Sequence, residues 1–300
     1  MVTLARPEGP RPEDFLHTRR GLGVLFFAGY AAAAVSAQAE TIHADSAGLT
    51  TETVMIPAKD GTMLPAYLAR PDAPGRCATV IVASEIFGVH EYIRDICRRL
   101  AKAGYAAIAP AFFFRAGDPA PLTDFGEIFK IVSQAGNDQI EDDVGSTLAW
   151  LDRQPFVDKR RYAVTGFCWG GAVAWMSVAR FRQFKAGVAW YGRLAAAPAA
   201  PGGPPPEKRP WPIDVVGRLH APVLGLYGGL DRGNPLSDIQ AMRNAMSEHH
   251  KTGEIIVYPE AQHGFHADYR ASYDEAAAKD GWARMLAWFE RYGVRPGARG

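Results

Sequence analysis

The sequence predicts an α/β fold in which a mostly parallel sheet, flanked by helices, forms a single domain. Three observations lead to this prediction. Short, continuously apolar runs recur along the chain, as in strands that are buried on both faces. Longer segments whose apolar residues have helical spacing alternate with those runs. The length of 300 residues suits one large domain, and no internal repeat is present.

The expected elements begin near Leu49 and alternate as far as residue 292. Two short strands flank the turn signal Lys59-Asp60-Gly61, and the first long helix ends at Gly104. The expected strands are 51–56, 63–69, 78–83, 105–109, 161–165, 186–190, 223–227 and 254–258. The expected helices are 91–103, 138–152, one that ends near 178, 235–246 and 273–292. This alternation favours parallel strands joined by crossover helices.

The first 39 residues are typical of an export signal. Residues 21–39 carry no charge, follow Thr18-Arg19-Arg20 and end in Ala37-Gln38-Ala39, a small-x-small cleavage pattern. The arginine pair resembles a twin-arginine signal. We expect cleavage of residues 1–39, leaving a domain of residues 40–300 that is periplasmic or exported and not stably inserted in a membrane. A retained anchor and a buried helix are the alternatives, and without a working signal the protein would be cytoplasmic.

Charge and cysteine content exclude several classes of function. Lys and Arg number 33 against 32 Asp and Glu, which argues against a broad basic field for nucleic acid. Three cysteines exclude a disulfide scaffold and a zinc site built from four cysteines, and no histidine pair has a convincing metal spacing. We therefore expect no metal, no cofactor and no nucleic-acid partner. We also expect a monomer, with the proline-rich residues 194–212 as a surface loop.

The segment Gly166-Phe167-Cys168-Trp169-Gly170 has the form Gly-x-nucleophile-x-Gly. It lies directly after an expected strand and before an expected helix. A sharp turn in that context lifts the central side chain above the sheet, and the glycines permit close backbone approach. Cys168 is therefore the candidate nucleophile. The alternative is a buried structural thiol, which is how we interpret Cys77 and Cys97, although pairing between those two stays open.

A nucleophile of this kind needs a base, and the base needs an acid that orients it. On this type of sheet the acid and then the base follow the nucleophile along the chain. Asp231 comes just after the expected strand 223–227, and His263 follows the expected strand 254–258. Both are therefore expected at the sheet edge that carries the nucleophile. A plain turn residue is the alternative for Asp231, and His266 competes with His263 as the base.

The segment Ser84-Glu85-Ile86-Phe87-Gly88 follows another expected buried strand and enters the same sheet edge from the other side. A second acid near a thiol can change the protonation of that thiol, which makes Glu85 a candidate functional residue. The alternative is a carboxylate that caps the helix starting near His90.

Four segments together resemble the dienelactone hydrolase family, which has the α/β-hydrolase fold. The resemblance spans about residues 50–292, and its segments are 84–88, 166–171, 227–231 and 263–265. It implies that Cys168 is the nucleophile, His263 the base and Asp231 the orienting acid.

The resemblance also assigns roles around this triad. Backbone N–H groups of Ile86 and Trp169 match the oxyanion hole of the family. Glu85 matches a glutamate that keeps the resting thiol neutral until substrate displaces it. Keeping the thiol protonated would protect it from oxidation.

The substrate of the family is a dienelactone, an unsaturated cyclic ester whose carboxylate is held by cationic side chains. Arg115 matches one of these cations, whereas Ala267 occupies the position of the second, and the nearest arginine is Arg270. We expect carboxymethylenebutenolidase-like hydrolysis of an ester or lactone through a cysteine acyl-enzyme. The alternatives are a general carboxylesterase or thioesterase on the same fold, and a non-catalytic binding protein on a hydrolase scaffold.

Overall fold

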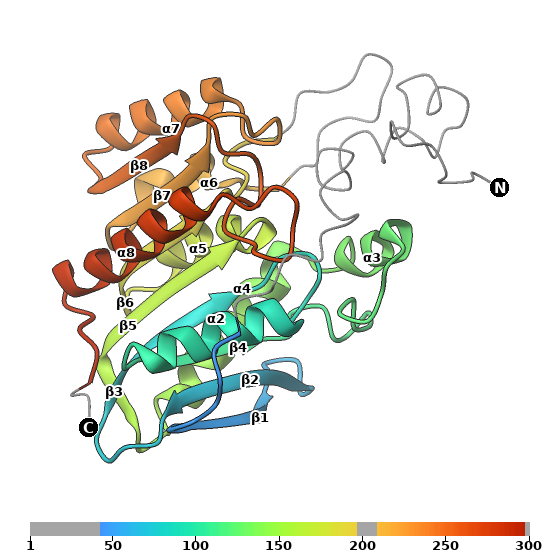
Figure 1. Ribbon diagram of the computed structural model, residues 1–300, viewed down its shortest axis with the longest axis vertical. Helices are drawn as coiled ribbons and strands as arrows, with labels where there is room; N and C mark the ends of the chain where they lie inside the picture. Colours follow the sequence, from blue (N-terminus) through green and yellow to red (C-terminus); the bar gives the residue numbers. More distant parts are fainter. Residues whose placement is uncertain (1–42, 197–208, 298–300) are drawn as a thin grey trace.

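The structure, a computed structural model, describes residues 43–196 and 209–297 (Figure 1). In this part of the chain, one eight-stranded sheet has the order β1-β2-β4-β3-β5-β6-β7-β8. The strands are β1 (Leu49–Pro57), β2 (Met63–Pro71), β3 (Cys77–Ala83), β4 (Ala106–Pro110), β5 (Val157–Phe167), β6 (Phe184–Trp190), β7 (Val223–Gly228) and β8 (Gly253–Tyr258). The predicted export signal, residues 1–39, and residues 197–208 of the proline-rich segment lie outside the described residues.

Strands β3 to β8 run parallel, and β2 pairs antiparallel with both β1 and β4. The continuous apolar runs mark the central strands, since every residue of β3 and of β7 is buried. The predicted mostly parallel sheet is confirmed, and each expected strand overlaps an observed one.

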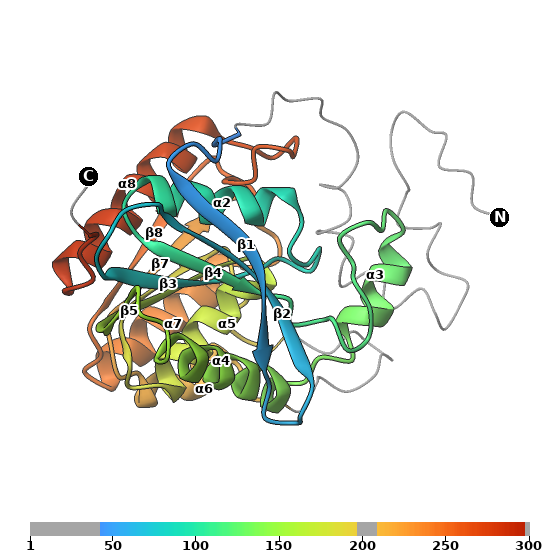
Figure 2. The same cartoon turned by 90° about the horizontal axis from the view of Figure 1, so that it is seen from below.

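Helices cover both faces of the sheet, with α2 and α8 on one side and α4, α5 and α7 on the other (Figure 2). Side chains of β3 alternate between the two sides, as the two-residue repeat of a strand requires. Val80 and Val82 pack in the core beneath α2 and α8, whereas Ile81 and Ala83 pack in the core beneath α4 and α5. The helices are α2 (Glu91–Lys102), α3 (Phe125–Val132), α4 (Asn137–Leu151), α5 (Trp169–Arg180), α6 (Pro212–Val215), α7 (Leu236–Glu248) and α8 (Glu275–Arg291), with a 3₁₀ turn η2 (Val216–Arg218).

Helix α3 stands away from the sheet (Figure 1) and was not among the expected helices, nor were the short α6 and η2. Its buried residues, Ile128 and Val132, pack in a small separate cluster with Ile86. A signal for α3 is nevertheless present, because the Asp124 side chain accepts a hydrogen bond from the backbone N–H of Glu127 (2.9 Å) at the helix start. Eight residues are too few for helical periodicity to stand out.

Strand β5 passes directly into α5 at Cys168, which adopts a backbone φ of +55°. Glycine is required on either side of Cys168 because a side chain there would overlap neighbouring backbone atoms. A Cβ atom on Gly166 would lie 1.9 Å from the carbonyl oxygen of Gly170, and one on Gly170 would lie 2.2 Å from that of Ala83. The end of β3 and the first turn of α5 are therefore in backbone contact, and the expected strand–turn–helix elbow is present.

We expect Gly170→Ala to lower the free energy of unfolding by about 3 kcal/mol, because the new methyl group overlaps the carbonyl oxygens of Ala83 and Ser84. Gly145→Ala in α4 is the control. Its Cβ would meet only the ring of Phe181 at 3.4 Å, so we expect no loss and a gain of up to about 1 kcal/mol from helix propensity. Urea unfolding measures both variants. If Gly170→Ala were as stable as wild type, the backbone of the elbow would be able to move away from the carbonyl groups of Ala83 and Ser84, and the steric requirement for glycine would be wrong.

Candidate active site

The loops after β3, β5, β7 and β8 carry the residues that the sequence singled out. Because these strands are parallel, their carboxyl ends meet at one edge of the sheet. Glu85 follows β3, Cys168 follows β5, Asp231 follows β7 and His263 follows β8. All four side chains are buried.

Asp231 and His263 form a hydrogen-bonded pair. Nδ1 of His263 lies 2.8 Å from Oδ2 of Asp231, and that oxygen also accepts from Nδ2 of Asn234 at 2.9 Å. Oδ1 of Asp231 accepts from the backbone N–H of Gly233 at 2.8 Å. Burial raises the pKa of Asp231, but the charge of His263 and these hydrogen bonds outweigh burial and keep it below its ordinary value. The carboxylate is thus ionised and held in one orientation.

His263 is also close enough to Cys168 for the two side chains to interact electrostatically. Burial lowers the pKa of His263, but the charges of Asp231 and Cys168, together with the hydrogen bond to Asp231, raise it to about 10. Because Nδ1 is used by Asp231, Nε2 is the nitrogen that can take the thiol proton. The backbone N–H of Cys168 donates to the carbonyl oxygen of Trp190 (3.0 Å), which holds the elbow against β6.

The two predicted oxyanion donors have free backbone N–H groups. Trp169 is the first residue of α5, so its N–H has no acceptor within the helix. Ile86 lies in a turn closed by a hydrogen bond from the N–H of Gly88 to the carbonyl oxygen of Glu85 (3.1 Å). No residue in the described ranges accepts from either amide. Both N–H groups can therefore donate hydrogen bonds to a reacting oxygen that becomes negatively charged.

Glu85 is buried against a cation and a phenol. Tyr269 donates its hydroxyl to Oε2 at 2.6 Å, Nη2 of Arg270 lies 3.1 Å from Oε1, and Nε2 of His90 lies 3.4 Å from Oε2. Burial raises the pKa of Glu85, but the charge of Arg270 and the hydrogen bonds from His90 and Tyr269 outweigh burial and lower it to about 2. Glu85 is therefore an ionised partner of Arg270.

These contacts differ from both sequence interpretations of Glu85. Its hydrogen bonds and ion pairs go to Tyr269, Arg270 and His90, and the described residues show none to Cys168. Nor does Glu85 cap α2, because His90 occupies the capping position without a side-chain cap bond. The physical reason is charge, since a guanidinium stabilises a buried carboxylate better than an uncharged donor does.

Arg115 was expected to hold a substrate carboxylate, but it binds two carboxylates of the protein itself. Nη1 and Nη2 donate to Asp143 at 2.8 and 2.9 Å, and Nε donates to Asp60 at 2.6 Å. The guanidinium also lies over the ring of Phe114. These pairs tie the β1–β2 turn to α4, and a substrate carboxylate would have to displace them. The structure therefore shows Arg115 bound to carboxylates of the protein, and its expected role in holding a substrate carboxylate stays a prediction.

His266, the competing base, is a buried neutral imidazole. Its Nδ1 lies 2.7 Å from the hydroxyl of Tyr92, and its ring stacks on Trp282. Burial, together with the charge of Arg99, lowers the pKa of His266 to about 3. His266 thus supports the site without contacting Asp231, and His263 is the histidine that the structure brings to the acid.

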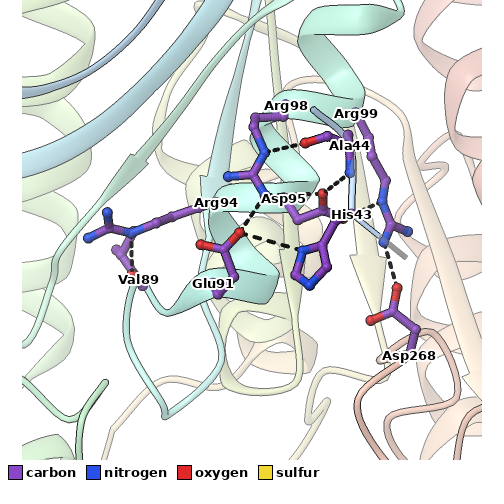
Figure 3. A network of polar contacts seen from close by, with 9 residues as sticks. All are labelled: His43, Ala44, Val89, Glu91, Arg94, Asp95, Arg98, Arg99 and Asp268. Atoms are coloured by element: carbon purple, nitrogen blue, oxygen red, sulfur yellow. Dashed lines mark hydrogen bonds and ion pairs between the residues drawn. The ribbon is translucent and has the colours of Figure 1, made fainter. Parts of the chain in front are cut away.

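A network of ion pairs on α2 holds the loop after β8 (Figure 3). Arg99 lies between two buried carboxylates, with Nε 2.5 Å from Oδ2 of Asp95 and Nη2 2.5 Å from Oδ2 of Asp268. Oδ1 of Asp95 also accepts from the backbone N–H of Ala44 at 2.6 Å. The ion pair between Arg99 and Asp268 therefore holds the loop that contains His263 against α2.

The described part of the chain contains no group of three or more His, Cys, Asp or Glu side chains that could hold a metal ion. In the same residues, no helix combines the length and the apolar character needed to cross a membrane. The side chains gathered at the site are a thiol, an imidazole and carboxylates, which is the set used in nucleophilic catalysis.

The family model described as "Dienelactone hydrolase family" matches residues 64–293. This chain belongs to that family. It is 44% identical over 281 residues to "Putative carboxymethylenebutenolidase" of Methylorubrum extorquens, across 93% of this chain and 94% of the relative. It is 44% identical over 271 residues to the protein of the same name in Salmonella typhimurium, across 90% and 97% of the two chains.

Solved structures lead to the same conclusion. The crystal structure of "Putative Dienelactone Hydrolase" from Klebsiella pneumoniae is 47% identical, with a TM-score of 0.74 over 81% of this chain and 99% of that one. The protein is thus an α/β-hydrolase of the dienelactone hydrolase family, and its substrate is a small-molecule ester or lactone.

We expect Arg115→Met to lower the free energy of unfolding by about 3 kcal/mol. The change leaves Asp143 buried without its cation, and the loss is at the low end for such pairs because Arg115 keeps some solvent access. Arg284→Met, which breaks a solvent-exposed pair with Asp280, is the control and should cost about 0.5 kcal/mol or less. Urea unfolding measures both. Unchanged stability with a selective loss of activity on anionic esters would contradict the structural role and support the substrate-binding role.

The contribution of Glu85 to stability should depend on pH. Its pKa of about 2 in the folded protein lies below the ordinary 4.5, so its contribution is present above pH 4.5 and is lost as pH falls towards 2. At neutral pH, Glu85→Gln should cost about 3 kcal/mol, because Arg270 loses its counter-charge. Urea unfolding between pH 2 and 7 should show this difference from wild type shrinking at acid pH. A difference that stays constant would contradict the ionised pair.

Proposed function

We propose that this protein hydrolyses its ester or lactone through a thioester acyl-enzyme formed on Cys168. The observation that carries the proposal is the convergence of the Cys168 elbow with the hydrogen-bonded pair of His263 and Asp231 at one sheet edge. A nucleophile, a base within reach of it and an acid that orients the base form the arrangement used in acyl transfer.

In the acylation half, His263 takes the proton of the Cys168 thiol, and the sulfur attacks the substrate carbonyl carbon. The carbonyl oxygen becomes negatively charged and is met by the N–H groups of Ile86 and Trp169. Each such donor typically contributes about 10²–10³ in rate. As the carbonyl re-forms, the C–O bond of the ester breaks, and His263 returns the proton to the leaving alkoxide.

In the deacylation half, His263 takes a proton from water, and the resulting hydroxide attacks the thioester carbon. The C–S bond then breaks, the acid product leaves, and the sulfur recovers its proton from His263. Asp231 stays ionised throughout and stabilises the imidazolium form. The raised pKa of His263 favours its imidazolium form, which is the form that gives the proton to the leaving alkoxide and later to the sulfur.

The primary candidate substrate is a dienelactone-like anionic lactone, which would make the protein carboxymethylenebutenolidase-like. A neutral ester is the second candidate, because two observations weaken carboxylate recognition. Arg115 is paired with Asp60 and Asp143, and Ala267 stands where a second cation was expected. Arg270 is the cation closest in sequence to that position, and its charge is shared with Glu85.

Steady-state kinetics of the purified protein on a dienelactone and on a neutral aryl ester test this proposal. Cys168→Ala should lower kcat by at least about 10³-fold on either substrate, because the thioester can no longer form. Cys77→Ala is the control, since Cys77 lies at the opposite end of β3, and it should keep wild-type turnover.

Retained turnover in Cys168→Ala would remove the acyl-enzyme proposal. A clear preference for the dienelactone supports the primary candidate substrate, whereas equal or better hydrolysis of the aryl ester supports the second. Mass spectrometry of the protein mixed with a slow ester should show the acyl group on Cys168.

A further inference from the structure

A strained residue directly follows β6 beside the site. Tyr191 has a φ of +41°, and it is one of three non-glycine residues with positive φ in the described ranges. It is fully buried, where a bulky side chain in this conformation costs free energy unless its surroundings enforce it. Cys168 also has a positive φ, so two backbone positions beside the site are strained. Such strain indicates that the surrounding structure holds the backbone in this conformation.

Backbone groups at this point contact the nucleophile elbow and the acid loop. The carbonyl oxygen of Trp190 accepts from the N–H of Cys168 (3.0 Å), and the N–H of Tyr191 donates to the carbonyl oxygen of Leu226 in β7 (2.8 Å). The carbonyl oxygen of Tyr191 accepts from Nδ2 of Asn234 (3.0 Å). The ring of Tyr191 meets the ring of His263 edge-on, with centroids 5.1 Å apart.

Asn234 is the link between this strained carbonyl and the acid. Its side-chain amide has two N–H groups, and one goes to the carbonyl oxygen of Tyr191 and the other to Oδ2 of Asp231 (2.9 Å). Both partners are pure acceptors, so only the nitrogen side of the amide fits there. Oδ2 is also the oxygen that binds Nδ1 of His263. The buried amide therefore fixes the oxygen that orients the base.

We propose that Asn234 is a positioning residue for the base: it anchors Oδ2 of Asp231 to the carbonyl oxygen of Tyr191 and so holds His263 in register with Cys168. The inference deepens the proposed acyl-enzyme function and rests on it. Asn234 does not touch the substrate in this scheme and acts only through Asp231. The titratable groups around this unit are Asp231 and His263, with the buried phenols of Tyr191 and Tyr227 nearby.

Asn234→Ala removes the donor and should lower kcat by about 10- to 100-fold, the value of one hydrogen bond to a charged group, while KM changes less than about twofold. A KM rise with unchanged kcat would overturn the proposal, because it would place Asn234 in substrate binding. Unchanged kcat and KM would overturn it as well. Circular dichroism verifies that the variant is folded.

Asn234→Asp provides an isosteric second variant with a pH signature. When its new carboxyl is protonated, its single O–H can still donate to Asp231 but not also to the carbonyl oxygen of Tyr191, so activity is retained in part. As pH rises and that carboxyl ionises, two carboxylates repel each other and the acid loses its orientation. The ratio of wild-type to variant kcat should therefore grow by about tenfold or more from acidic to alkaline pH.

A matched control is Asn244→Asp, the same change at an exposed position of α7. Its ratio to wild type should stay flat with pH. A flat ratio for Asn234→Asp as well would contradict the positioning role, since a purely structural asparagine gives no titration of kcat.

Alkylation of Cys168 by iodoacetamide separates failure of this inference from failure of the proposed function. The rate–pH profile of alkylation reports the coupling of His263 to the thiol without any turnover. In Asn234→Ala, half-maximal alkylation should move to higher pH, because a misoriented Asp231 supports the imidazolium less well. A profile identical to wild type would overturn the positioning role even in a protein that hydrolyses esters. A shifted profile without hydrolysis would support the positioning role and refute the acyl-enzyme proposal.

Discussion

Backbone contact between the end of β3 and the first turn of α5 is the constraint on which the site depends. Glycine at 170 lets the main chain of the elbow approach the carbonyl groups of Ala83 and Ser84, where a Cβ atom would overlap them, and glycine at 166 leaves room for the carbonyl group of Gly170. At this contact Cys168 has a positive φ, and Ile86 packs in the same small cluster as Trp169, the first residue of α5. One steric condition thus sets the nucleophile and both candidate oxyanion donors together.

Buried charge holds the remaining loops. Glu85 with Arg270, Asp231 with His263, and Arg99 between Asp95 and Asp268 each join segments far apart in the sequence. Removing an ion from water costs several kcal/mol, and this cost is repaid only by close, well-oriented partners. A loop that strays from its partner leaves a charge uncompensated, so these pairs give the site rigidity that the loops would not have by themselves. They also set the protonation of Glu85 and of His263.

The fold was predictable because its signals are local. Apolar runs marked the buried strands, a turn signal marked the first two strands, helical spacing marked the long helices, and Gly-x-Cys-x-Gly after a strand marked the elbow. Helix α3 was not predicted, because its eight residues are too few to show helical periodicity and bury only a small cluster. Asp124 and Glu127 nevertheless carry a capping signal at its start. The order of Cys168, Asp231 and His263 followed from the parallel sheet, in which carboxyl ends of strands share an edge.

The sequence by itself determined the sheet, the elbow and which residues stand at the carboxyl ends of the strands, since these depend on patterns within a few neighbouring residues. Only the tertiary structure decided which partner each charged group takes. Arg115 pairs with Asp60 and Asp143, and Glu85 pairs with Arg270. Such choices depend on distances across the fold and on desolvation, and no local pattern encodes either quantity.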